Sequence, residues 1–415
     1  MKIKLNVFQF VKLSFFVMLL YSSFLMELLE IKIANMTLAL GALTAFLMLV
    51  DMAAINYNPL KVVTSNVRRI LLFVVMCALS VVTATYRAAA IDGMIQLVQC
   101  LLLLVIVIYI CIREGNLTFC ARTIVIVMGL GAIHALTNMD SFDQRLALSE
   151  TSNANVFGHN AVLGACMTPL VFKKETRIKK ILHIGLLILF SVPVVISASR
   201  MSFIALIGYL SIYLLVIAPR SIGPSRFSWG VRFLGVLGVA IVVLYFVLEA
   251  LRDTLIMDRM NELFNVLDTG EGDGEARIYL YEEAWRLFLQ YPIFGAGYAN
   301  FGPIHYGVYT HSTYAEILSC TGIMGFVPFV CYYWHISKEL RKGVRLDNAQ
   351  RLSVNHYLVL VFVVLLLLGI GEILIYKIKY FVVFGMLAAQ FTINREQLGL
   401  HQEIKPPEER NDEKN

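Results

Sequence analysis

One arginine of the sequence is predicted to lie among apolar side chains, where its charge needs a partner. Residues 276 to 290 have the pattern of a helix that ends before a proline. At about 100° per residue, Arg277 falls on the same side of this helix as Tyr281 and Phe288, whereas Arg286 falls on the charged side. A guanidinium among apolar groups is costly unless it meets an anion. Arg277 therefore predicts either an ion pair with an acidic residue of the same segment or bidentate binding of an anion such as phosphate.

A histidine stands directly before the predicted start of another helix. Thr313 and Glu316 have the spacing of a capping box, which puts His311 at the N-terminus of that helix. The helix dipole there favours bound anions and disfavours a protonated imidazole. A neutral His311 beside a phosphate has the properties of a general base that takes the proton of a hydroxyl group. The alternative is a boundary histidine without a chemical role.

Two more arginines lie in polar segments at the ends of apolar runs. Arg200 lies in the turn Ser197–Ser202 between two such runs, and Arg145 opens a polar stretch that ends at Gly158. Each guanidinium can either extend to the membrane surface or hold a lipid-linked phosphate there. Four histidines inside or at the ends of apolar runs are interpreted as satisfied core or boundary residues: His134, His159, His183 and His356.

No motif for a cofactor or a metal ion accompanies these residues. The sequence has no P-loop, no Rossmann fingerprint and no Ser-His-Asp spacing. Its 7 cysteines form no CxxC pair and have no histidine at metal-ligand spacing. Basic blocks interleaved with aromatic residues are absent as well, so that no nucleic-acid partner is expected. We therefore expect the protein to work without a cofactor and without a metal ion.

The elements that position these residues are predicted to be membrane helices. The chain has 415 residues, of which 58% are hydrophobic and 15% are charged, and its mean hydropathy is +0.72. This composition excludes an ordinary soluble enzyme. Because a bilayer core needs about 20 apolar residues per helix, we expect an all-α polytopic integral membrane protein with about 12 transmembrane helices. The spans are predicted near residues 7–27, 34–55, 70–85, 92–112, 120–137, 156–172, 180–198, 202–218, 231–250, 313–335, 353–371 and 376–393.

The distribution of Lys and Arg between these spans predicts the topology. With a cytoplasmic N-terminus, the inward segments carry more than twice as many Lys and Arg residues as the outward segments, so both termini are expected in the cytoplasm. One large extracytoplasmic loop, at about 251–312, contains the short amphipathic helix with Arg277. We expect residues 1–393 to form a single membrane domain with a catalytic-like region at 197–326. Residues 394–415 are expected to be a disordered cytoplasmic tail.

Four short motifs follow one another between Ser197 and Phe326. They are Ser199-Arg200, the helix segment from Arg277 to Trp285, the P-x-x-G-x-G segment from Pro292 to Phe301, and the stretch from His311 through Glu316 to Gly322 and Gly325. In their order and predicted membrane side, these motifs resemble the superfamily of O-antigen ligases and Wzy-type polysaccharide polymerases. One departure is Ser312, because the family usually has an asparagine after the histidine.

The resemblance implies a metal-independent glycosyltransferase at the outer face of the bacterial cytoplasmic membrane. Its donor is a glycan linked to undecaprenyl diphosphate. The resemblance implies that Arg200 and Arg277 hold the diphosphate as leaving group and that His311 accepts the proton of the acceptor hydroxyl. With these three as catalytic residues, Arg145, Tyr281 and Glu316 are expected to bind substrate. The family also implies a flippase and a chain-length regulator as possible partners.

The identity of the acceptor separates two activities within this superfamily. A polymerase transfers the chain to the next lipid-linked repeat unit, whereas a ligase transfers it to lipid A core or to protein. The polar stretch after Arg145 and the segment Tyr291–Gly297 resemble those of polymerases, which we therefore favour. A transporter of lipid-linked oligosaccharides is the alternative from another class. Transporters place their ionisable groups near the membrane midplane, whereas the unusual charges of this sequence are predicted at the outer surface.

Overall fold

The computed structural model describes residues 6–28, 36–139, 145–148, 153–171, 176–214, 254–269, 275–346 and 353–404, together with a few positions between 231 and 252. Within these residues no strand occurs, and the regular elements are helices. They are α1 (Val7–Leu20), α2 (Met26–Leu28), α3 (Met36–Ala54), α4 (Ser65–Ser80), α5 (Arg87–Glu114), α6 (Thr118–Thr137), α7 (Ala154–Met167), α8 (Arg177–Ile196), α9 (Arg200–Ile212), α12 (Leu255–Thr269), α13 (Glu275–Gln290), α14 (Phe301–Ile304), α15 (Thr313–Leu346), α16 (Val354–Gly371) and α17 (Ile378–Ile404), with short 3-10 turns such as Val81–Thr83 and Leu374–Tyr376.

Seven stretches of helix in the described part of the chain are long and apolar enough to cross a membrane. They are Val7–Leu25, Met36–Ala54, Ser65–Thr83, Arg87–Glu114, Thr118–Thr137, Thr313–Arg345 and Val354–Gly371. Two further apolar helices, Ile181–Ile196 and Arg200–Ile212, are shorter. The span expected at 231–250 falls almost wholly outside the described residues. The polytopic helical architecture is thus confirmed, whereas the number of about 12 spans stays a prediction.

The bundle is held together by close approaches between helices at small residues. A Cβ atom on Gly385 of α17 would lie 2.8 Å from Val107 Cβ and 2.9 Å from Leu104 O of α5, so only glycine lets these helices pack at this distance. On α1 and α3 the hydroxyl oxygens of Ser14 and Thr44 are 2.7 Å apart and hydrogen-bonded. Small residues and interhelical hydroxyl bonds are what membrane helices use where lipid leaves no hydrophobic driving force between them.

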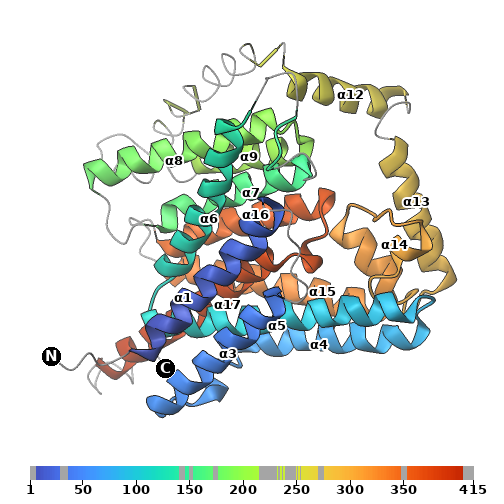
Figure 1. The fold of residues 1–415 in the computed structure, drawn as a ribbon. Helices are drawn as coiled ribbons and strands as arrows, with labels where there is room; N and C mark the ends of the chain where they lie inside the picture. Colours follow the sequence, from blue (N-terminus) through green and yellow to red (C-terminus); the bar gives the residue numbers. More distant parts are fainter. Residues whose placement is uncertain are drawn as a thin grey trace, which may run out of the picture.

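The segment expected as a large loop contains three helices instead of one. The predicted amphipathic helix is α13, and α12 and α14 precede and follow it. Figure 1 shows these three helices on the side of the molecule away from the beginning of α1 and the end of α17. Leu280, Ala284 and Leu287 of α13 are buried against the segment before α15, which fixes α13 on the bundle.

Helix α17 extends beyond residue 394, where the disordered tail was predicted to begin. It continues to Ile404, and the first residues after 393 have partners in the bundle. Arg395 Nη2 donates to Glu339 Oε2 of α15 at 2.8 Å, and Asn394 Nδ2 donates to Asn355 Oδ1 of α16 at 2.9 Å. The rest of the predicted tail, residues 405–415, lies outside the described residues.

Candidate functional site

The turn that carries His311 is built on the buried carboxylate of Glu316. The side chain of Glu316 is 0% exposed, and its Oε2 accepts hydrogen bonds from Thr310 N at 3.3 Å and Thr310 Oγ1 at 2.8 Å. Its Oε1 accepts a bond from Tyr376 Oη at 3.0 Å. Because these bonds fix residues on both sides of His311, Glu316 acts on the turn, and its predicted contact with substrate stays a prediction.

Helix α15 begins at Thr313 as predicted, but the capping residue is different. Ser312 Oγ accepts a hydrogen bond from Ala315 N at 3.5 Å, so Ser312 caps the helix in place of Thr313. The hydroxyl of Thr313 instead donates to Glu372 O at 2.7 Å and accepts from Leu374 N at 2.9 Å. These two hydrogen bonds of the Thr313 hydroxyl link the His311 turn to the connection between α16 and α17.

His311 itself has a strained backbone and a depressed pKa. Its φ is +55°, in the left-handed region that a non-glycine residue rarely adopts. Such strain persists only where the surroundings impose it, and it is common at functional sites. Burial lowers the pKa of His311, the charge of Arg277 lowers it further, and Glu372 opposes both effects. The imidazole is therefore neutral near pH 7, and Arg277 and Glu372 lie within electrostatic range of it.

Arg277 lies on the buried side of α13, as the helical periodicity predicts. It precedes Leu280 and Ala284 on the face that packs on the bundle. Within the described part of the chain it forms no ion pair, in contrast to Arg286, which bonds to Glu283 at 2.7 Å and is 65% exposed. Of the two sequence-based interpretations, an internal ion pair has no support among these residues. Binding of an external anion fits the position of the guanidinium.

Arg145 lies within electrostatic range of three other arginines, one of which is Arg277. Burial lowers the pKa of Arg145, and the charges of Arg259, Arg200 and Arg277 lower it further. These four guanidinium groups, from the segment 145–148 and from α12, α9 and α13, form what we call the arginine cluster. Like charges held close together in a partly buried place repel one another, and a bound anion relieves that repulsion.

Each member of the arginine cluster is held by its own contacts. Arg145 Nε donates to Ser197 O at 3.1 Å, and its Nη2 donates to Asn155 Oδ1 of α7 at 2.6 Å. Arg200 Nη2 lies 3.6 Å from Glu262 Oε2, and the Arg200 side chain is 12% exposed. The Nε of Arg259 is buried and has no hydrogen-bond partner among the residues that the structure describes. The sequence analysis missed Arg259, because nothing in its local pattern distinguishes it from an arginine in solvent.

The turn before Arg200 rests on a glycine of α7. A Cβ atom on Gly158 would lie 2.6 Å from Ser197 Oγ and 2.7 Å from Ser202 Oγ. Ala198 within the turn has a φ of +48°, and Ser202 Oγ donates to Ser199 Oγ at 2.8 Å. The serines of this turn thus serve tight packing against α7, and they bring Arg200 and Arg145 to the same end of that helix.

The P-x-x-G-x-G segment inserts its backbone into a break in α15. At Gly322 the helix is interrupted by a residue with φ +60° and ψ −162°. Two carbonyl oxygens before the break and two amides after it bond to the inserted segment instead of to α15. These bonds are Ala296 N to Ser319 O (3.0 Å), Gly297 N to Cys320 O (3.0 Å), Ile323 N to Pro292 O (2.9 Å) and Met324 N to Ile293 O (3.1 Å). The glycine motifs are therefore structural, and they hold the His311 end of α15 against α13.

Replacing Gly295 by alanine is expected to prevent accumulation of folded protein. Gly295 has a φ of +72°, and its Cβ atom would lie 2.2 Å from the carbonyl carbon of Cys320. Gly115 is the matched control, because it has a φ of +65° with no atom within 4 Å of the added Cβ. Gly115→Ala should cost only the left-handed conformation, about 1–2 kcal/mol. Membrane levels and thermal unfolding of both variants measure the difference, and equal behaviour of the two would contradict the crowding at Gly295.

Tyr281 lies one turn after Arg277 and is bonded to the membrane bundle. Its Oη donates to Ile370 O near the end of α16 at 3.1 Å. Burial raises the pKa of Tyr281, and the charge of Arg277 opposes this rise. The hydroxyl therefore anchors α13 beside the arginine cluster, while its predicted role in substrate binding stays a prediction.

Two residues far apart in sequence form a pair that the sequence analysis missed. His159 of α7, which was interpreted as a core histidine, bonds through Nδ1 to Glu372 Oε2 at 2.9 Å. Glu372 follows α16, so 213 residues separate the partners. No local periodicity signals a contact of this kind, because it forms only when the two helices pack. The pair lies next to the His311 turn, since Glu372 O accepts the bond from Thr313.

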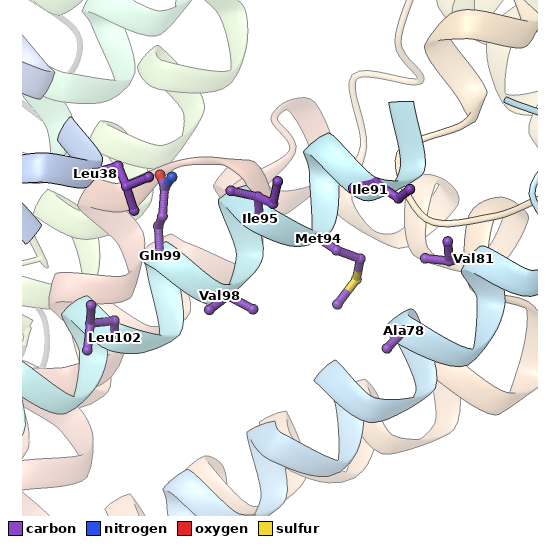
Figure 2. A pocket seen from close by; sticks show the side chains of 9 residues that line it. All are labelled: Leu38, Ala78, Val81, Ile91, Met94, Ile95, Val98, Gln99 and Leu102. Atoms are coloured by element: carbon purple, nitrogen blue, oxygen red, sulfur yellow. The ribbon is translucent and has the colours of Figure 1, made fainter. Parts of the chain in front are cut away.

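An apolar groove of about 430 Å³ lies apart from these polar groups. Figure 2 shows its lining, in which Gln99 is the polar exception among apolar side chains of α3, α4, α5 and the turn after α4: Leu38, Ala78, Val81, Ile91, Met94, Ile95, Val98 and Leu102. Ile91, Ile95 and Val98 are about half exposed. None of the predicted site residues lines this groove, so it is separate from the polar side chains of the candidate site.

Comparison with protein families yields one match. Residues 185–330 match the family model described as O-antigen ligase, which confirms the resemblance to that superfamily. The matched region contains Arg200, Arg277 and His311 but not Arg145 or His159. No curated protein matches the chain. The family match supports an enzyme of the glycosyltransferase kind that processes lipid-linked polysaccharide in the membrane.

Proposed function

From the match of residues 185–330 to the O-antigen ligase family model, we propose that this protein is a polymerase of a bacterial surface polysaccharide of the O-antigen or capsule type. It transfers a glycan chain from undecaprenyl diphosphate to the next lipid-linked repeat unit at the outer face of the cytoplasmic membrane. Both termini are cytoplasmic in this proposal. The separation of α12, α13 and α14 from the ends of α1 and α17 in Figure 1 supports that topology.

The observation that carries the proposal is the arginine cluster beside a neutral histidine. Arg277 lies within electrostatic range of both Arg145 and His311. Guanidinium groups match phosphate oxygens with two parallel hydrogen bonds, and several together neutralise a diphosphate. Positive charge prearranged where a leaving group becomes more negative stabilises the transition state. Arg200 and Arg277 have this role, and Arg145 and Arg259 add to the field that holds the diphosphate.

His311 supplies the base for the transfer. The acceptor hydroxyl oxygen attacks the anomeric carbon, and the bond between that carbon and the diphosphate oxygen breaks. The diphosphate leaves with the bonding electron pair, and His311 takes the proton of the hydroxyl. This scheme uses only side chains of the chain and needs no metal ion. The apolar groove beside α5 offers a surface for the polyprenyl tail.

The depressed pKa of His311 predicts the pH dependence of the reaction. The neutral form is the active base, so kcat/KM is expected to be constant at neutral pH and to fall as the pH drops through the pKa of His311. Because burial and Arg277 lower that pKa, the fall should lie below pH 6.5, about the value for an unperturbed histidine. Initial rates of the purified protein, measured as a function of pH, give the midpoint of this fall in kcat/KM. A midpoint above pH 6.5, about the value for an unperturbed histidine, would contradict the assignment of His311 as the base.

The glycan profile of a deletion strain tests the function and its alternatives. The strain is complemented with the wild type, and surface and lipid-linked glycans are resolved by repeat-unit number. A polymerase predicts that the deletion loses the ladder and keeps single repeat units on their final carrier. A ligase predicts full-length chains that accumulate on the polyprenyl carrier. An unchanged glycan length with altered movement of headgroups across the membrane would identify a transporter.

A further inference from the structure

His159 presents a ring nitrogen that no described group of the protein uses. Its side chain is 1% exposed, and within the described part of the chain Nε2 is buried without a hydrogen-bond partner while Nδ1 is bonded to Glu372. A buried polar atom left unpaired loses its hydrogen bonds to water without replacement, so native structures rarely contain one without a reason.

Glu372 determines which ring nitrogen carries the proton. Burial by itself raises the pKa of Glu372, but the bond with His159 and the charges of His159, Lys379 and Lys377 lower it to about 2. Glu372 is therefore a carboxylate, which only accepts hydrogen bonds. His159 must donate through Nδ1–H, and in the neutral form of the ring the lone pair is on Nε2. A carboxylate that holds a histidine in this tautomer is the arrangement by which enzymes orient a proton-accepting imidazole.

The position of His159 connects it with the arginine cluster. Asn155, one helical turn earlier on α7, accepts the bond from Arg145 Nη2. Gly158, next to His159, packs against the serine turn before Arg200. Arg277 lies within electrostatic range of His159, and Glu372 is joined to the His311 turn through Thr313. Neighbours of His159 on α7 thus contact Arg145 and the turn before Arg200, and its partner Glu372 contacts the His311 turn.

We propose that His159 Nε2 binds a sugar hydroxyl of the acceptor and that Glu372 is the positioning residue that fixes the tautomer for this bond. The inference rests on the proposed function, because it deepens the description of the acceptor at that site. The hydroxyl donates to Nε2, no covalent bond is made there, and His311 remains the base. A buried acceptor of this kind discriminates strongly against a sugar without the hydroxyl, because the nitrogen would again be left unpaired.

Three variants separate this role from simple packing. His159→Asn keeps an amide donor near the position of Nδ1 and removes Nε2. His159→Gln puts an amide group near the position of Nε2 and removes Nδ1. Glu372→Gln keeps an acceptor for Nδ1–H without the charge. The matched control is His183→Asn, because His183 is another histidine of a membrane helix, and it stacks on Tyr213 with ring centroids 5.9 Å apart.

The assay uses the purified full-length protein in lipid nanodiscs, with saturating undecaprenyl-diphosphate-linked repeat unit as donor. The varied acceptor is a short-chain prenyl-diphosphate-linked repeat unit. We expect His159→Asn to raise KM for this acceptor about tenfold or more with an unchanged unfolding temperature. His159→Gln should retain more activity than His159→Asn. As a single substitution, Glu372→Gln should raise KM. Added to His159→Asn it should have no further effect, because Glu372 acts through the imidazole of His159.

Two results would overturn the inference. One is a wild-type KM for His159→Asn, and the other is a loss of activity in His159→Asn that is matched by a lower unfolding temperature, as a packing role predicts. Equilibrium binding of the same acceptor, measured without turnover, keeps this failure apart from failure of the proposed function. If the wild type transfers no glycan, the function fails. If it transfers glycan but binds the acceptor no better than His159→Asn, only the subsite fails.

Discussion

Replacing Arg277 by alanine is expected to lower glycan transfer about a thousandfold or more while the protein accumulates in the membrane at the wild-type level. The reason is that Arg277 belongs to the arginine cluster and forms no ion pair among the described residues, so its charge is available to the diphosphate. Removing a prearranged hydrogen-bond donor from a site of developing charge lowers kcat about 10²–10³-fold. Removing an arginine that stabilises a transferring phosphoryl group lowers kcat about 10³–10⁵-fold. Initial rates of repeat-unit transfer and the glycan ladder in cells measure the effect.

The same helix provides the control for this variant. Arg286 is on the opposite side of α13, is 65% exposed and bonds to Glu283. Exposed ion pairs contribute about 0–1 kcal/mol, so Arg286→Ala should retain near-normal activity and stability. Arg277→Lys should be intermediate, because an ammonium keeps the charge but cannot bind two oxygens in parallel. Near-normal transfer by Arg277→Ala would remove the arginine cluster from the mechanism.

Replacing His311 by alanine is expected to lower kcat about 10²–10⁴-fold with little change in binding of the donor. This range is the usual contribution of a positioned general base. The turn around His311 should survive the substitution, because its hydrogen bonds come from Thr310, Ser312 and Glu316 and not from the imidazole. Relief of the left-handed strain is not expected, since alanine tolerates a φ of +55° no better than histidine does.

A histidine at another helix end is the control for His311. His134 lies in the last turn of α6, where its Nδ1 is near Asn138 Nδ2 at 3.2 Å. It has no contact with the arginine cluster among the described residues, and His134→Ala should leave the glycan ladder intact. The assignment of the base would be refuted by His311→Ala protein that transfers glycan at the wild-type rate.

The predictions that succeeded depended on local periodicity. The apolar runs predicted membrane helices, and about 100° per residue was sufficient to put Arg277 on the packed face of α13 and Arg286 on the other face. The start of α15 at Thr313 followed from capping spacing, although Ser312 is the residue that caps it. Hydrogen-bonding residues with similar spacing compete for one helix end, so the sequence indicates the end but not which residue caps it.

The features that were missed depend on contacts between distant segments. His159 and Glu372 meet across 213 residues, and the buried carboxylate of Glu316 accepts a hydrogen bond from Thr310. Arg259 becomes distinctive only when α12 brings it beside Arg145. In each case the local sequence is compatible with an ordinary core or surface residue, and tertiary packing alone creates the special environment.

The break in α15 also determines how this protein can be recombined with proteins that resemble it. Four backbone groups of this membrane helix, between Ser319 and Met324, bond to the segment Pro292–Gly297. In hydrocarbon such groups have no water to replace a lost partner, and each costs several kcal/mol when unpaired. A chimera that exchanges acceptor preference must therefore move residues 292–324 as one block. A crossover between the inserted segment and the break would combine an inserted segment from one protein with a helix break from another. The four backbone hydrogen bonds between them would then depend on a match that the two parent proteins do not guarantee.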